Sequence, residues 1–571
     1  MNRPPAGRLA ALFVALVIGF AGIVVRLGFL QVRDAGTYQD LATQQRVRVL
    51  PLPATRGAIQ DRFGRDLALS LDARAIYADP RYVSEPSVAA EKLAPLLKTR
   101  PIQLEHLLKG DGSFVYLARQ VDRGIADRVA RLNLPGIGFL QESKRHYPAG
   151  SFGAPQVLGF VGIDGAGLSG LELEYQDLLD GEDGERQEEI DPSGRGIPQG
   201  VDLVRPPVAG EDLVTTIDPH LQFQAQLSLE DAVRRNGAKG GTVVVLDPDN
   251  GDILAMASYP WFDPNRFGSA SEENLENPAV TTVYEPGSVN KVITVSAALE
   301  ENQVRLNERF DVPDKWRIGD AVFHDAHPHA PMSMTINDIV TQSSNVGVIR
   351  VAAKVGPDLM ASYLARFGFG QETGVGFPGE LEGIIPSRYR YWDTTMATIP
   401  IGQGLAVTPL QMAQVYAVIA NGGEWVQPRL VRGTTDQAGK YHPAPAQATR
   451  RVVSEKTADL VTRMLANVVR TGTGTEAQIP GYWVAGKTGT AQKPKTEGPG
   501  YTRKFVGSFI GFLPSSDPQI VIAAILDEPA LKYGGVTAAP LFQQIGKEAI
   551  ARLRIPPGER PRPLPSAAGD R

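Results

Sequence analysis

The sequence predicts a mixed fold of the α/β (α+β) class behind a membrane anchor, and three observations lead to this prediction. Residues 9–25 form an uncharged apolar run at the N-terminus. Segments typical of strands, rich in Val, Ile and Ala, gather in two groups, at residues 240–260 and 481–529. Helical segments, among them the apolar residues 289–299, lie between the two groups. We therefore expect one antiparallel sheet assembled from both ends of a domain around a helical cluster.

The apolar run continues past Arg26, so residues 9–30 are long enough to cross a hydrocarbon core of about 30 Å. A cleavable signal peptide is the alternative, but its apolar part is usually shorter, and no small-x-small cleavage site is evident before Arg26. We expect a retained anchor preceded by a short tail, residues 1–8. Two arginines precede the run and two follow closely, so the charge count alone does not orient it.

Composition excludes several classes of function. The chain has 571 residues, 42% of them apolar and 21% charged, which allows two or three domains with large cores. A net charge of −5 without a long basic run argues against nucleic-acid binding. The absence of cysteine excludes disulfides, thiolate metal sites and cysteine nucleophiles.

Local signals divide the rest of the chain. Residues 38–205 mix short strands, charged helical patches and glycine-rich turns, without an evident nucleophile. A second domain, 206–556, opens with a strand and a helix that begins at Asp218-Pro219, followed by two apolar strands around Asn250-Gly251, the dipeptide best suited to a tight hairpin turn. Residues 557–571 are rich in proline, and we expect them to be disordered.

The segment YEPGSVNKVITVSAALE, residues 284–300, places Ser288 and Lys291 one turn apart at the start of the apolar helix. The pattern alone is weak, because most copies of Ser-x-x-Lys are a helix cap followed by a solvated lysine. Here the helix has no solvated face for Lys291, and a lysine held away from water favours its neutral form. Such an amine can take the proton of the hydroxyl, beside the unpaired N–H groups of the helix start. The pair predicts a nucleophile and its base.

Two further motifs follow in the chain. Ser343, Ser344 and Asn345 lie where one helix is predicted to end and another to begin, and the first late strand carries Lys487, Thr488, Gly489 and Thr490. Each motif has an ordinary explanation, because Ser-Ser-Asn is common in caps and turns and Lys-Thr-Gly is common at the exit of a strand. The three in this order, each on the expected kind of element, indicate a serine acyl-transfer site.

With these motifs the chain resembles the penicillin-binding proteins, specifically the monofunctional class B D,D-transpeptidases with a membrane anchor. RGAIQDRFGRDLALS, from Arg56, and HYPAGSFGAPQVLGFVGIDGAGLSGLELEYQDLLDG, from His146, extend the resemblance toward the N-terminus. Phe63 stands where the family usually has Asn, and Gln156 stands near a usual His, so the interdomain contacts of these two positions are open. The resemblance implies a membrane-proximal pedestal (dimerisation-like) domain in residues 38–205 and a penicillin-recognising transpeptidase domain in residues 206–556.

The resemblance also implies roles for the motif residues. Ser288 would attack the carbonyl of the penultimate D-alanine of a peptidoglycan stem peptide, Lys291 would take its proton, and the N–H groups of Ser288 and Thr490 would hold the oxyanion. Ser343 would relay a proton to the leaving D-alanine, and Asn345 would bind the substrate amide. The substrate-binding strand is Lys487, Thr488, Gly489 and Thr490: the two threonines would receive the terminal carboxylate, and the charge of Lys487 would disfavour a second ammonium at Lys291.

The segment FHDAHPHA, with His324, Asp325, His327 and His329, is a candidate metal site. The residues lie in a loop that contains proline, without the i, i+4 spacing that places two imidazoles on one helical face. We therefore expect a loop near the substrate cleft, no metal and no cofactor.

Three classes of function remain open on the sequence: a cross-linking transferase, a hydrolase on the same fold (a carboxypeptidase or β-lactamase), and a β-lactam sensor or non-catalytic scaffold. The intact motifs and the anchor favour the transferase, with stem peptides as substrates and β-lactams as inhibitors. The wording of EPGS and YGGVTAAP, together with the chain length, favours septal wall synthesis during cell division over side-wall elongation. The resemblance implies a single-pass bacterial membrane protein with a cytoplasmic N-terminus and an extracytoplasmic catalytic domain. Its expected partners are a polytopic glycan polymerase and division proteins.

Overall fold

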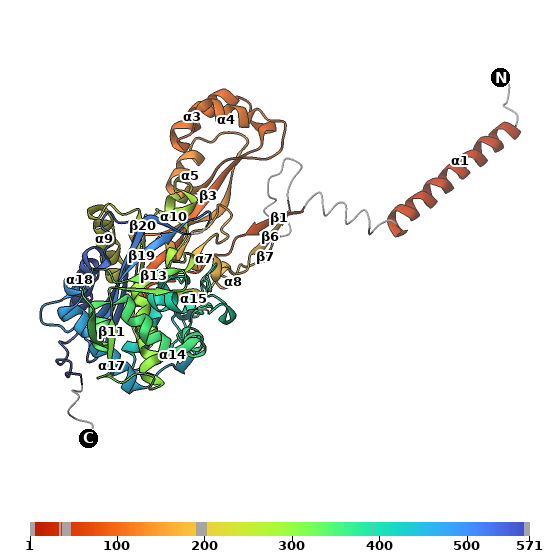
Figure 1. Ribbon diagram of the computed structural model, residues 1–571. Coiled ribbons are helices and arrows are strands. Elements are labelled where there is room, and N and C mark those ends of the chain that lie inside the picture. The colour runs from red at the N-terminus through yellow and green to blue at the C-terminus, as the bar shows by residue number, and fades with distance from the viewer. Residues whose placement is uncertain are drawn as a thin grey trace. The chain divides into compact units, whose positions relative to one another are not determined.

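The computed structural model describes residues 6–33, 36, 47–189, 202–391, 393–498 and 500–564. The chain divides into two compact units (Figure 1). The first contains Met1–Thr55 and Gly181–Ala209, and the second contains Arg56–Asp180 and Gly210–Arg571.

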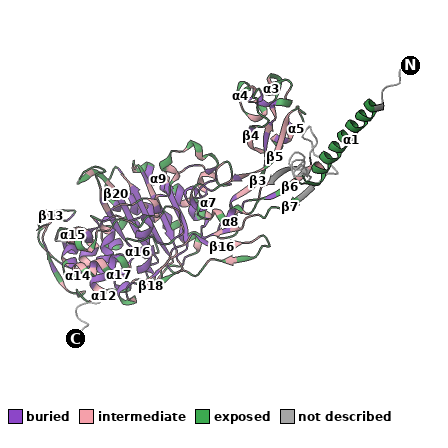
Figure 2. Ribbon diagram, turned by 90° about the vertical axis from the view of Figure 1, so that its right-hand side faces the viewer, coloured by how far each residue is buried: buried purple, intermediate pink, exposed green. Residues whose placement is uncertain are grey.

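The first unit contains the predicted anchor and a small sheet. Helix α1 (Ala6–Gly28) continues into one π-helical turn, η1 (Phe29–Arg33), and its side chains are exposed along its length (Figure 2). Its 23 residues correspond to about 35 Å, enough to cross a membrane. This helix is consistent with a single-pass anchor. The sheet has the antiparallel order β1-β6-β7, with β1 Val47–Leu52, β6 Gly184–Glu189 and β7 Asp202–Arg205.

The second unit is built around a five-stranded antiparallel sheet of order β10-β9-β21-β20-β19. Its strands are β9 (Gly240–Leu246), β10 (Ile253–Tyr259), β19 (Ala485–Pro494), β20 (Tyr501–Leu513) and β21 (Ile520–Asp527). The prediction of one antiparallel sheet assembled from both ends of the domain is confirmed. The predicted hairpin is also confirmed, but its connection runs over residues 247–252 and is longer than the tight turn expected at Asn250-Gly251. Gly251 adopts a positive φ of 65° within this connection.

Alternating side chains of the sheet belong to two different cores, and the strands are buried along most of their length (Figure 2). Val243 and Val245 pack toward α9 (Pro219–Arg235) and α18 (Gly534–Leu553). Val244 and Leu246, on the opposite face, belong to the core that includes the helical cluster. The helices of this cluster are α12 (Lys291–Glu300), α13 (Ile336–Gln342), α14 (Asn345–Arg366), α16 (Pro409–Ala420) and α17 (Glu455–Thr471).

Shorter elements connect these parts. The hairpins and short strand pairs are β11 (Arg309–Val312) with β14 (Met332–Thr335), β12 (Lys315–Ile318) with β13 (Ala321–His324), and β15 (Glu424–Val426) with β18 (Thr449–Arg451). The short helices are α6 (Pro155–Leu158), α7 (Gly170–Glu174), α8 (Gln176–Asp180), α10 (Glu272–Leu275), α11 (Pro278–Thr281) and α15 (Asp393–Thr398).

A second large sheet joins strands that are far apart in the sequence. Its order is β17-β16-β8-β2-β3-β4, with β5 paired to β3. The strands are β2 (Ile59–Gln60), β3 (Asp66–Ala78), β4 (Val115–Asp122), β5 (Ile137–His146), β8 (Asp212–Thr215), β16 (Val431–Thr435) and β17 (Tyr441–Pro443). Helices α3 (Pro86–Leu97), α4 (Pro101–Leu108) and α5 (Arg123–Ala130) close a small core against β3 and β4. The sheet therefore includes strands from both sides of the predicted domain boundary at residues 205/206. The boundary itself stays a prediction.

A buried ionic cluster joins the two membrane-proximal stretches on which the family resemblance rests. Glu172 is fully buried and accepts hydrogen bonds from Arg56 Nε and Arg145 Nε, each at 2.7 Å. The Tyr147 hydroxyl donates to the same carboxylate at 3.2 Å. A buried carboxylate is tolerated because these three donors replace its lost water.

Both departures from the family pattern make contacts across the predicted domain boundary. Phe63 is 54% exposed, and the guanidinium of Arg552, on α18, lies 5.1 Å from its ring centroid. Gln156 is buried and donates from Nε2 to the carbonyls of Pro260 and Asn274, at 3.0 and 3.4 Å. A cation–π contact and an amide bridge therefore link the two sides at these positions.

The proline-rich end of the chain has no helix or strand over residues 557–564. The Pro563 carbonyl accepts a hydrogen bond from Arg463 at 3.2 Å, and Arg560 lies over the ring of Trp483. Residues 565–571 lie outside the described part of the chain, and the disorder expected for this tail stays a prediction.

Candidate active site

Ser288 lies in a 3-10 turn, η5 (Gly287–Asn290), that leads directly into α12. Gly287 has φ +62°, and its N–H donates to the carbonyl of Gly402 at 3.0 Å. An added Cβ at Gly287 would lie 3.1 Å from the Thr490 carbonyl oxygen, so glycine allows the turn to lie against β19. Ser288 is partly exposed, whereas its neighbours Val289 and Asn290 are buried. The turn thus presents one hydroxyl at the surface of a buried helix start.

Lys291 is 1% exposed, which confirms the prediction that its helix has no solvated face. Its Nζ donates to the Ser343 carbonyl at 2.6 Å and to Asn345 Oδ1 at 2.8 Å, and lies 3.3 Å from Ser343 Oγ. Among the described residues it makes no hydrogen bond to Ser288 Oγ.

Ser343, Ser344 and Asn345 connect α13 to α14, as predicted. Ser343 ends α13 in the left-handed conformation, with φ +60°, which breaks the helix at this residue. Its Oγ accepts hydrogen bonds from Lys291 Nζ and, at 2.8 Å, from Lys487 Nζ. The second hydroxyl of the site therefore lies between two lysines.

The KTGT segment lies on β19, as predicted, and Lys487 is fully buried. An added Cβ at Gly489 would lie 2.2 Å from Ser508 Oγ and 3.0 Å from the Pro286 carbonyl oxygen, so only glycine allows this approach to the Ser288 turn. Thr488 Oγ1 is 2.7 Å from Thr473 Oγ1, and Thr490 Oγ1 accepts from Gly534 N at 3.2 Å. The strand thus brings two threonine hydroxyls beside the turn that carries Ser288.

The two lysines have perturbed protonation equilibria. Burial lowers the pKa of Lys291 to about 7, against an opposing effect of the Asp325 carboxylate. Burial also lowers the pKa of Lys487 well below its ordinary value, and repulsion from Lys291 adds to this effect. The repulsion is mutual, so it disfavours two ammonium groups at once, while the Asp325 carboxylate supports the ammonium form of Lys291.

Residues outside the three motifs also shape the site, and the sequence analysis did not assign them roles. Asp325 accepts hydrogen bonds from the backbone N–H groups of Asn345 and Val346, at 2.6 and 2.9 Å. Among the described residues, no group of three or more His, Asp or Glu side chains is placed to hold a metal ion. The loop lies next to the motif residues, as expected. No pattern in the sequence indicated that Asp325 would contact Asn345.

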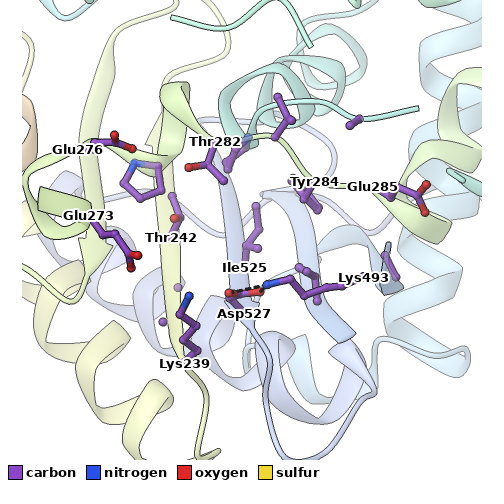
Figure 3. A pocket seen from close by; sticks show the side chains of 18 of the residues that line it. Lys239, Thr242, Glu273, Glu276, Thr282, Tyr284, Glu285, Lys493, Ile525 and Asp527 are labelled. Carbon is purple, nitrogen blue, oxygen red and sulfur yellow. Dashed lines mark hydrogen bonds and ion pairs between the residues drawn. The ribbon is translucent and has the colours of Figure 1, made fainter. Parts of the chain in front are cut away.

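A cavity of about 500 Å³ lies beside this site, where one end of the five strands meets residues 282–285 (Figure 3). Lys493 and Asp527, on its wall, form an ion pair at 2.8 Å. Tyr284 Oη and Glu285 Oε2 are buried and have no hydrogen-bond partner within the described part of the chain. The cavity is lined by none of the predicted site residues, which meet instead at the start of α12.

Comparisons with known proteins agree with this geometry. The family model described as Penicillin binding protein transpeptidase domain matches residues 241–547, more than half of the chain, and the model described as Penicillin-binding Protein dimerisation domain matches residues 51–215. The chain belongs to the penicillin-binding protein family. In this penicillin-binding protein, all three motifs lie inside the region that matches the transpeptidase model.

Several relatives of this penicillin-binding protein are similar over nearly its whole length. The probable peptidoglycan D,D-transpeptidase PbpC of Pseudomonas aeruginosa is 35% identical over 96% of this chain and 95% of its own. The peptidoglycan D,D-transpeptidase FtsI of Escherichia coli is 33% identical over 96% of this chain and 92% of its own. A crystal structure of penicillin-binding protein 3 from Mycobacterium tuberculosis, complexed with ampicillin, has a TM-score of 0.72 at 33% identity and covers 90% of this chain and 98% of that chain.

Proposed function

We propose that this protein is a serine-type peptidoglycan D,D-transpeptidase that cross-links stem peptides through an acyl-enzyme on Ser288. The observation that supports this most strongly is the cluster of Lys291, Ser343, Asn345 and Lys487 beside the Ser288 turn. A hydroxyl beside a buried lysine of lowered pKa is the arrangement that acyl transfer needs.

In the acylation step, Ser288 Oγ attacks the carbonyl carbon of the penultimate D-alanine, and the neutral amine of Lys291 takes the hydroxyl proton. The N–H groups of Ser288 and Thr490 hold the oxyanion, an assignment supported by the close approach of the Gly287 and Thr490 backbones. The C–N bond then breaks. Ser343, which accepts from both lysines, passes a proton to the departing D-alanine nitrogen.

Substrate binding is assigned to the remaining motif residues. Asn345 binds the amide of the stem peptide. Thr488 and Thr490, with Gly489 between them, receive the terminal carboxylate, in the field of Lys487. An amine of a neighbouring stem peptide then attacks the ester, which releases Ser288 and completes the cross-link. β-Lactams would acylate the same serine.

The location and domain roles follow from this chemistry, because peptidoglycan lies outside the cytoplasmic membrane. Residues 9–30 would be the single-pass anchor, with residues 1–8 in the cytoplasm. Residues 38–205 would be the pedestal, residues 206–556 the transpeptidase domain and residues 557–571 the tail. A polytopic glycan polymerase and division proteins would be its partners at the membrane.

A septal role is the form of this function that we favour. It is supported by the EPGS and YGGVTAAP segments and by the similarity to FtsI over nearly the full chain. Imaging of a fluorescent fusion of the full chain tests this role, and a side-wall pattern would contradict it.

A hydrolase would need a carboxylate that activates water on the acylated serine, and Glu380 and Glu382 are the sequence candidates. Glu380 Oε1 instead accepts hydrogen bonds from the N–H and hydroxyl of Thr373. Its carboxylate is therefore held within its own loop. Glu382 is exposed. These contacts favour the transferase over the hydrolase.

The function is tested with a labelled penicillin and the full-length protein in detergent. Covalent label should appear on Ser288 and be absent from Ser288→Ala, with Ser296→Ala, a buried serine on α12, as the matched control. Intact-mass spectrometry after removal of free drug should show an adduct that lasts many minutes, because deacylation without a general base loses about 10² to 10⁴ in rate. Retention of label in a folded Ser288→Ala variant would refute the nucleophile. An adduct lost within seconds would indicate a hydrolase.

A further inference from the structure

The loop after β13 contacts the site with the carboxylate of Asp325, a residue that is 8% exposed. Oδ1 accepts from the N–H groups of Asn345 and Val346, at 2.6 and 2.9 Å. Oδ2 accepts from Ser344 Oγ at 2.7 Å and faces His329 Nε2 at 3.0 Å. The carboxylate therefore binds the first turn of α14, where unpaired N–H groups and the helix dipole favour a negative charge.

This turn carries Asn345, and the loop holds that side chain from a second point. Asn345 Nδ2 donates to the His324 carbonyl at 3.0 Å, whereas its Oδ1 accepts from Lys291 Nζ at 2.8 Å. Both ends of the amide are thus committed, and its orientation follows from these partners. A displacement of the loop would move Asn345, and with it the amine of Lys291.

The loop also sets the charge near the two buried lysines. The groups that face Asp325 are His329 and His324 from its own loop, Asp314 after β11, Lys291 from α12 and the N-terminus of α14. Lys487 faces Lys291 from β19. Asp325 is the carboxylate that opposes the effect of burial on the pKa of Lys291.

His329 lies against this carboxylate, and both of its ring nitrogens face acceptor groups. Its Nε2 faces Asp325 Oδ2, and its Nδ1 faces the Ala330 carbonyl at 2.8 Å. Two acceptors around one ring are satisfied only by the imidazolium. The hydrogen bond to the Ala330 carbonyl has the largest effect and raises the pKa of His329, and the hydrogen bond to Asp325 raises it as well.

We propose that Asp325 is a positioning residue of the transpeptidase site: it holds Asn345 against Lys291 and supplies the negative charge that Lys291 senses, while His329 offsets part of that charge. This inference rests on the proposed role of Lys291 as the base. It adds that a loop outside the three motifs determines the pH at which Lys291 becomes active as the base.

The test is the rate of acylation by labelled penicillin as a function of pH, measured on the full-length protein. Asp325→Asn keeps the shape and loses the charge, so the pH midpoint of the rate should fall by about one unit. The limiting rate at high pH should fall about 10-fold as Asn345 loosens. His329→Gln removes the opposing positive charge and keeps a donor, so its midpoint should move the other way, to higher pH. Asp320→Asn, exposed on the β12–β13 turn, is the matched control and should leave both unchanged.

The midpoint separates a positioning role from a purely structural one. If both variants lower the limiting rate and leave the midpoint unchanged, Asp325 is only a helix cap and the inference is overturned. If Asp325→Asn does not fold, the upward shift in His329→Gln decides, and its absence overturns the inference. Wild-type protein that takes up no label on Ser288 would instead refute the proposed function itself.

Discussion

At the scale of single residues, the chemistry depends on the burial of two lysines. Lys291 and Lys487 are both buried, and both contact Ser343 Oγ. Two ammonium groups this close repel each other, and burial removes both from bulk water. The state with two ammonium groups is therefore disfavoured, which supports the proposed role of Lys291 as the base for Ser288.

The pH dependence of acylation follows from the pKa of Lys291, about 7. Below this pH the ammonium cannot accept a proton, so the rate should rise about 10-fold per pH unit and level off above about pH 7. Lys291→Arg keeps a cation without a base, and its rate should be about 10² to 10⁴ lower at every pH. Stopped-flow or gel-based labelling from acid to alkaline pH measures both. A rate that does not vary with pH, or a fully active arginine variant, would contradict this assignment.

At the scale of elements, helix ends and turns fix the positions of the long helices. Asp218 is fully buried and accepts from the N–H groups of His220 and Leu221, at 3.0 and 3.2 Å, which caps α9. The same carboxylate forms an ion pair with Arg552 of α18 at 2.9 Å. One side chain thus connects the start of α9 to the end of the last helix on the same face of the sheet.

Loss of this cap should destabilise the fold without removing the catalytic groups. Asp218→Ala leaves two N–H groups and Arg552 without their acceptor, and we expect a loss of about 2 kcal/mol in the free energy of unfolding. Asp218→Asn, the control, keeps an acceptor for the N–H groups and should lose less. Urea unfolding monitored by tryptophan fluorescence measures the difference, with Ser288 labelling as a check on the site. Equal midpoints for the alanine variant and the wild type would refute the capping role.

At the scale of the whole molecule, the described structure consists of two units, one with an exposed apolar helix and the other large and globular. The unit that contains Arg56–Asp180 and Gly210–Arg571 holds all three motifs, the sheet and the buried Arg56–Glu172–Arg145 cluster. Its cores draw on residues from both sides of the predicted domain boundary. The catalytic groups therefore need no contribution from the anchor.

A chain that begins at Arg33 should accordingly stay in solution without detergent and still acylate. We expect its labelling rate to match that of the full-length protein within about twofold, because every predicted site residue lies in the unit that this shorter chain keeps whole. Ultracentrifugation and labelling of the two proteins side by side measure this. A soluble, folded chain with much slower labelling would show that the anchor shapes the site.

The sequence by itself determined the features that depend on neighbouring residues. The helix over the apolar run, the hairpin around Asn250-Gly251, the start of α9 and the kinds of element that carry the three motifs were all predicted and are found in the structure. These features depend on residues only a few positions apart. The same reasoning placed Lys291 on a helix without a solvated face.

Only the tertiary structure decided which distant groups meet. Lys291 lies 54 positions from Asn345, and Glu172 lies 116 from Arg56, so no local pattern predicts either contact. Asp325 looked like part of a histidine-rich loop, and packing placed its carboxylate at the start of α14. A pKa depends on every charge and on the water within a few ångströms, and that environment exists only once the chain has folded.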